Sequence, residues 1–121
     1  MATVFPDGAY KAFKYITVDT NENPIYTCPA AGFLAAHVVW VAASDDAADA
    51  RTITLTWRDS SASVTYTLNY QAAIAANTAF EREFKPLVLE PGDTLRATGS
   101  ATGIHITGAV IEVARPSRGG G

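Results

Sequence analysis

Few residues of this 121-residue chain have the types and spacing that chemistry needs. The two histidines, His37 and His105, each lie in an apolar run, with no carboxylate at a telling spacing. A hydrogen-bonded structural role is therefore favoured at both over general-base catalysis or metal binding. The sequence also lacks a G-x-S-x-G motif, a phosphate-binding glycine loop and a paired His and Cys set. We expect no enzymatic activity, no catalytic residues and no cofactor.

Two acidic segments resemble cation sites at first reading. The D-x-N-x-N pattern at 19–23 matches the start of a calcium loop. That loop needs glycine at position six and glutamate at position twelve, and this chain has Pro24 and Ala30 there. The three aspartates of 45–49 lie in an alanine-rich loop, where we expect them to be solvated. No metal site is predicted, and 19–23 is interpreted as an Asx-rich turn.

Four aromatic residues could form a platform for sugar rings: Trp40, Trp57, Tyr66 and Tyr70. Trp57 and Tyr66 fall on the predicted core face of a hairpin, however, and core packing is favoured for them. A carbohydrate-binding β-sandwich therefore remains an alternative function rather than the leading one.

Composition narrows the class of protein. A net charge of −3 and scattered arginines argue against binding to duplex nucleic acid, because such binding requires clustered basic residues. The single Cys28 permits no internal disulfide. No signal peptide is recognised, and the longest apolar run, 33–43, is too short to span a bilayer, so we expect a soluble, cytosolically made protein without a membrane partner. Charged residues are 17% of the chain, below the roughly 25% of typical domains. Either an Ala- and Thr-rich surface or burial in an assembly would explain this.

Alternation of apolar and polar residues with period two dominates the chain and predicts β-strands. The segment 71–79 is interpreted as a crossing loop or single turn, and Lys85-Pro86 as a break between two short strands. The expected fold class is all-β, a single antiparallel β-sandwich, jelly-roll-like, with about eight strands. The predicted strands are 12–19, 24–28, 33–42, 51–57, 63–70, 80–84, 86–90, 94–98 and 104–113.

The fourth and fifth predicted strands form a hairpin. Pairing Trp57 with Val64 also pairs Leu55 with Tyr66 and Ile53 with Leu68, and it places every apolar residue on one face. We therefore predict that this face is in the core, with the following members: Ile53, Leu55, Trp57, Val64, Tyr66 and Leu68.

Two other strands have unusual patterns. In 33–42 one predicted face holds Phe33, Ala35, Val39 and Val41, the other holds Leu34, Ala36, Val38 and Trp40, and only His37 is polar. An antiparallel strand with both faces apolar is covered on both sides. The cover is either a segment of this chain (71–79 or the N-terminal arm) or a neighbouring subunit. In 104–113 the apolar phase changes at Thr107-Gly108, which predicts a β-bulge.

The segments I-Y-T-C-P-A, R-T-I-T-L-T-W-R-D and P-L-V-L-E-P-G-D-T-L-R-A-T-G-S-A, followed by a closing strand, resemble the small β-sandwich virion proteins of tailed bacteriophages. The resemblance covers roughly residues 24–114. It implies a non-enzymatic structural protein located on the virion and made in the bacterial cytoplasm. The favoured role is a capsid decoration or cement protein that staples capsomer junctions. A head–tail connector, neck or tail component is the alternative.

The resemblance also implies partners: the major capsid protein or other virion proteins, and further copies of the chain in a dimer or trimer. We expect an N-terminal arm at 1–11, the sandwich at 12–114 and a flexible C-terminal tail at 115–121. The residues predicted to form the interface are Val4, Phe5, Tyr10, Phe33, Val39 and Val41.

Overall fold

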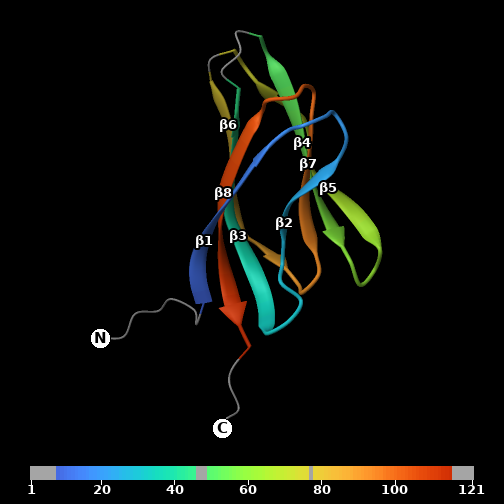
Figure 1. The fold of residues 1–121 in the computed structure, drawn as a ribbon, viewed down its shortest axis with the longest axis vertical. Coiled ribbons are helices and arrows are strands. Elements are labelled where there is room, and N and C mark those ends of the chain that lie inside the picture. Colours follow the sequence, from blue (N-terminus) through green and yellow to red (C-terminus); the bar gives the residue numbers. More distant parts are fainter. Residues whose placement is uncertain (1–7, 46–48, 77, 116–121) are drawn as a thin grey trace, which may run out of the picture.

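The computed structural model describes residues 8–45, 49–76 and 78–115. Within them, eight strands form two four-stranded sheets (Figure 1). Sheet A has the order β1-β8-β3-β6 and sheet B the order β2-β7-β4-β5. The strands are β1 (Gly8–Ile16), β2 (Asn23–Thr27), β3 (Phe33–Ser44), β4 (Arg51–Asp59), β5 (Val64–Ile74), β6 (Ala79–Leu89), β7 (Thr94–Gly99) and β8 (His105–Ala114).

The order of pairing identifies the topology. The antiparallel pairs include β1 with β8, β2 with β7, β3 with β6 and β4 with β5, so the chain is one long hairpin rolled into two sheets. This is the jelly roll, and the predicted fold class is confirmed. No helix in the described part of the chain is long and apolar enough to cross a membrane.

The core lies between the two sheets and is built from alternate residues of the strands. Among the described residues, seventeen hydrophobic ones are buried there. The largest fully buried ones are Ile53, Leu55, Ile74, Leu89, Leu95, Ile104, Ile106, Val38, Val41 and Val110. The first residue of β1 and the last residues of β8 lie at the same end of the sandwich, since Gly8 pairs with Val113 (Figure 1).

Several predicted strand limits are wrong. The segment 71–79 is mostly strand, because β5 continues to Ile74 and β6 starts at Ala79. Lys85-Pro86 does not divide two strands; β6 runs through it. A proline is tolerated there because β6 is an edge strand and its ladder with β3 is interrupted between Glu83 and Leu87, opposite the bulge of β3. β1 starts at Gly8, four residues before the predicted sandwich boundary; residues 1–7 and 116–121 lie outside the described residues.

The β4–β5 hairpin exists, but its predicted register is wrong. Trp57 pairs with Tyr66, not with Val64, and irregularities in the pairing lie on both sides of Leu55. Ile53 and Leu55 are fully buried as predicted, and Trp57 and Leu68 pack against the core. Val64 and Tyr66 are exposed instead, because β5 is the edge strand of sheet B and the turn of the hairpin projects from the sandwich (Figure 1).

The predicted faces of β3 are also wrong beyond Val38. A bulge between Val38 and Trp40 shifts the register against both neighbouring strands. Consequently Ala36 and Val38 face the core on one side of the bulge, and Val41 and Ala43 on the other. The inner cover of β3 is therefore sheet B, to which the segment 71–79 contributes the buried Ile74 of β5.

β8 has no bulge at Thr107-Gly108, contrary to the prediction, because it pairs with β1 in one unbroken register. Its inward phase runs from Ile106 through Gly108 and Val110 to Glu112. The buried Glu112 accepts a hydrogen bond of 2.5 Å from the Tyr26 hydroxyl. Burial, and then this carboxylate, raise the pKa of Tyr26. A charged residue thus occupies an inward position that an apolar pattern alone cannot reveal.

Candidate interaction surface

The outward side chains of sheet A form a regular grid, which we call the outer face of sheet A. Residues that pair directly across an antiparallel ladder point to the same side of the sheet. The inward positions are the buried ones, so their neighbours along each strand point outward. From β1 across β8 and β3 to β6, the four rows are Ile16–His105–Ser44–Ala79, Lys14–Thr107–Ala42–Glu81, Ala12–Ala109–Trp40–Glu83 and Tyr10–Ile111–His37–Val88.

This face is largely apolar and open to solvent. Four of its large hydrophobic side chains are well exposed: Tyr10 (61%), Ile16 (53%), Val88 (46%) and Trp40 (38%). Together with the alanines of the middle rows they form a contiguous surface over all four strands. Exposed apolar patches that extend this far mark interaction sites more often than isolated apolar residues do.

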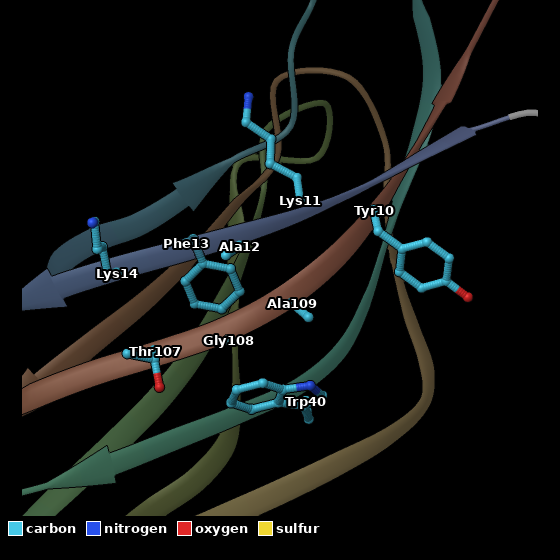
Figure 2. A pocket seen from close by; sticks show the side chains of 9 residues that line it. All are labelled: Tyr10, Lys11, Ala12, Phe13, Lys14, Trp40, Thr107, Gly108 and Ala109. Atoms are coloured by element: carbon cyan, nitrogen blue, oxygen red, sulfur yellow. The ribbon is translucent and has the colours of Figure 1, made fainter.

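A hollow of about 370 Å³ lies in the middle of this face. Its base is formed where small residues of β1 and β8 adjoin, at Ala12, Gly108 and Ala109. Figure 2 shows Trp40 and Tyr10 on either side of Ala109. The hollow exists because the outward-pointing Ala12 and Ala109 have short side chains, while Tyr10 and Trp40 beside them carry aromatic rings.

The two edges of the outer face carry opposite charges. Lys14 lies on the β1 edge, and Glu81 and Glu83 lie on the β6 edge beside Trp40. Lys14 and Glu81 belong to the same row, connected through Thr107 and Ala42. The surface therefore has an apolar centre, a basic edge and an acidic edge.

The outer face of sheet B is different, because threonine and arginine predominate on it. Glu22 covers part of it: the carboxylate accepts a hydrogen bond from Thr56 (2.7 Å) and lies 3.6 Å from the Arg96 guanidinium. Polar side chains of this kind are satisfied by water and by one another. Residues on this face include Thr52, Thr54, Arg58, Thr65, Thr67, Thr94 and Thr98.

The structure separates the residues predicted to form an interface. Tyr10 lies on the outer face of sheet A and is exposed, whereas Phe33 and Val39 are half-buried. Val41 is fully buried in the core, so its prediction as an interface residue is wrong. Val4 and Phe5 lie outside the described residues.

Other members of the outer face were missed by the sequence analysis, Trp40, Lys14 and Glu81 among them. Some of them could have been predicted from β1 and β8, if the alternation of inward and outward residues had been taken as unbroken along each strand. Their rows could not be found, because each row combines strands from both ends of the chain.

An acidic cluster elsewhere has a structural role. Carboxylate oxygens of Asp59, Glu90 and Asp93 lie within 4.8 Å of one another. Both oxygens of the buried Asp93 already accept hydrogen bonds: Oδ1 from the Ser60 backbone N–H (3.0 Å), and Oδ2 from the Trp57 indole (3.2 Å) and the Glu90 backbone N–H (3.0 Å). Asp93 thereby fixes the β6–β7 turn to the β4–β5 hairpin.

The remaining residues considered for chemistry have structural partners or lie at the surface. Asp19 accepts hydrogen bonds from the Asn21 N–H and the Asn23 amide, both at 2.9 Å, and these lower the pKa of Asp19 in an Asx turn. Asp45 pairs with Arg51 at 3.2 Å. Burial raises the pKa of the Cys28 thiol. The two histidines lie on the outer face of sheet A, in different rows.

No protein-family model matches the sequence, and no curated protein matches it significantly. Among solved structures, the chain is similar to a chain of infectious bursal disease virus Gx strain, with a TM-score of 0.51 and 10% identity over 89% of this chain and 30% of that one. Two crystal structures of a pentameric capsid protein isolated from metagenomic phage sequences each give a TM-score of 0.43, with 20% and 19% identity over 85% of this chain and 62% and 63% of theirs. The chain spans less than two thirds of all three. The first likeness shows a shared fold.

Proposed function

We propose that this chain is a non-enzymatic structural protein of a virus particle, and that the outer face of sheet A is buried against another protein subunit. The observation that carries the proposal is the contrast between the two outer faces. Sheet B presents threonines and arginines on β4 and β7 and exposes Val64, Tyr66 and Tyr70 on its edge strand β5, whereas sheet A exposes Tyr10, Ile16, Trp40 and Val88 across its strands. Removing such surface from water is favourable by about 25 cal/mol per Å². The jelly-roll fold and its likeness to a chain of a virus structure support the virion as the place of assembly.

Within the particle, we favour a decoration or cement protein on the head over a neck or tail component. One jelly roll without repeats fits a small accessory subunit that stabilises neighbouring capsid proteins by surface contact. The resemblance of residues 24–114 to tailed-phage virion proteins also points to this group.

The proposal is tested on particles of the virus that encodes the chain. Antibodies raised against the purified protein should label intact particles, with gold over the head surface. Label confined to the head–tail junction would replace decoration by the neck alternative. Absence of the protein from purified particles, by labelling and by mass spectrometry, would contradict a virion role altogether.

The predicted N-terminal arm gives a second experiment. Because β1 starts at Gly8, a deletion of residues 2–7 leaves all eight described strands intact. We expect the deletion variant to remain folded, with the thermal unfolding midpoint of the full chain, but to wash off particles at lower denaturant concentrations. Retention equal to that of the full chain would place the attachment on the sandwich alone.

Carbohydrate binding is a second candidate, favoured by one observation. Tyr66 and Tyr70 are exposed on β5, and the Trp57 ring lies 5.2 Å from that of Tyr66 with a tilt of 32°. Exposed aromatic faces of this kind can stack on sugar rings. Glycan-array binding that is lost in Tyr66→Ala would promote this candidate, and a blank array would remove it.

A further inference from the structure

We propose that the occupant of the outer face of sheet A is a second copy of the chain, packed face to face about a twofold axis parallel to the strands. Such a dimer goes beyond the proposed function, because it forms in solution whether or not the protein joins a particle. Three features of the face support it: the order of its charges, the shape of its centre and its extent.

The geometry follows from the rows. A twofold axis that runs between β8 and β3, parallel to both, reverses the strand order but keeps each row at its own level. β1 of one copy then faces β6 of the other, and β8 faces β3. Every contact occurs twice, as in any isologous interface.

Charge selects this axis over its alternative. Lys14 and Glu81 share a row on opposite edges, so each Lys14 faces Glu81 of the second copy, and two such ion pairs form. A twofold axis perpendicular to the strands would place β1 over β1 and β6 over β6. The glutamates of one β6 would then face the glutamates of the other, and Lys14 would face a β1 strand with no acidic residue on this face, an arrangement that like-charge repulsion disfavours.

Shape supports the same axis. Trp40 and Ala109 are direct partners in one row, on either side of the axis. The operation therefore sets each Trp40 over Ala109 of the second copy, where the hollow formed with Ala12 and Gly108 lies. A large ring meets a small depression twice. Aromatic residues that enter such central pockets are the type that dominates interface energies.

The extent of the face meets the requirement for a stable dimer. Four strands about 4.8 Å apart and nine residues long give roughly 600 Å² of flat sheet per copy. The two copies together then bury roughly 1,200 Å², at the lower end for specific interfaces. Two twisted sheets pack at about −30°. The resulting offset at the edges is within the reach of the flexible Lys14 and Glu81 side chains.

The test is the mass of the protein by sedimentation equilibrium over a range of concentrations. The wild-type chain should be a dimer. Lys14→Glu places glutamate opposite Glu81 twice, and Glu81→Lys places lysine opposite Lys14 twice, so each variant alone should weaken the dimer at least about tenfold. An equimolar mixture of the two variants should dimerise again, since every facing pair is then of opposite charge.

Two controls make the result specific. Thr67→Glu introduces a charge on the edge strand of sheet B, away from the proposed interface, and should leave the dimer unchanged. Trp40→Ala should raise the dissociation constant of the dimer at least about tenfold. If the sheets met only at their edges, this substitution would leave the constant unchanged. Circular dichroism verifies that each variant is folded, and the recovery of dimers in the mixture verifies it independently.

A wild-type monomer at every concentration, a larger ring, or single charge variants that dimerise as well as the wild type would each overturn this inference. Failure of the proposed function is a different result. A protein that dimerises as described but is absent from virus particles removes the virion role and leaves the dimer.

Discussion

Replacing Asp93 by alanine should destabilise the sandwich by about 3 kcal/mol, because a fully buried charged acceptor of several hydrogen bonds is lost. The carboxylate is fully buried, and the Ser60 N–H, the Trp57 indole and the Glu90 N–H all donate to it. Without it, these three groups lose their shared acceptor, and the β6–β7 turn is no longer fixed to the β4–β5 hairpin. Urea unfolding followed by circular dichroism measures the loss.

Asp93→Asn makes the test sharper. Donors approach both oxygens of Asp93, so whichever way the asparagine amide turns, its NH₂ group faces another donor. We expect this variant to be destabilised as well, although its shape is preserved. The neighbouring Asp59 serves as the matched control, because its bonds to Ser61 and Ala62 are exposed, and Asp59→Asn should cost about 1 kcal/mol or less. Equal stabilities for the Asp93 and Asp59 variants would show that Asp93 has no special role.

Gly108→Ala should destabilise the protein by about 3 kcal/mol, at the upper end for an overpacked core. A Cβ atom at this position would overlap the Phe13 ring and lie 2.6 Å from the backbone oxygen of Trp40. The ring has little room to move, because Phe13 is buried and packs against Tyr26 at 5.8 Å. The midpoint of denaturant unfolding gives the effect.

A double-mutant cycle with Phe13→Leu identifies the cause. Leucine removes part of the ring that overlaps the added Cβ, so the double variant should be more stable than the sum of the two single losses predicts. The contact with the Trp40 oxygen remains, and recovery should therefore be partial. Strictly additive losses would show that the Phe13 ring is not what excludes a side chain at position 108.

The β4–β5 hairpin shows how much of the fold the sequence could predict. Threonines alternate with Ile53, Leu55 and Trp57, so the strand and its inward face were evident. The register was not evident. At Trp57 it differs from the predicted register by two residues, a shift that keeps the same residues on the same face, and alternation does not reveal the irregularities beside Leu55. Edge position was also hidden, and it leaves Tyr66 in solvent.

β3 and β8 mislead for a different reason. Both faces of β3 are apolar, so the change of phase at the bulge after Val38 does not alter the pattern of apolar and polar residues. In β8, Glu112 reads as an outward residue, yet it is buried because the Tyr26 hydroxyl, far away in the sequence, donates to it. Non-local partners of this kind determine a residue's environment and are absent from any local pattern.

The same limit applies to the candidate surface. Tyr10 could be proposed from its type and its place near the N-terminus. Lys14 and Glu81 face the same side only because β1, β8, β3 and β6 assemble in that order and register. A surface composed of strands from opposite ends of the chain becomes visible only when the sheet is complete.

The meeting of Gly8 with Val113 at one end of sheet A gives the molecule a direction. β1 begins and β8 ends there, while the turn that connects β7 to β8 lies at the other end (Figure 1). A twofold axis parallel to the strands keeps that direction, so the first residue of β1 and the last residue of β8 lie on the same side in both copies of the dimer. Tethers fused at those positions would act bivalently, since the first to bind raises the local concentration of the second. The far side, which holds the β7–β8 turn, is then the place where an inserted peptide would be displayed away from whatever surface the tethers hold.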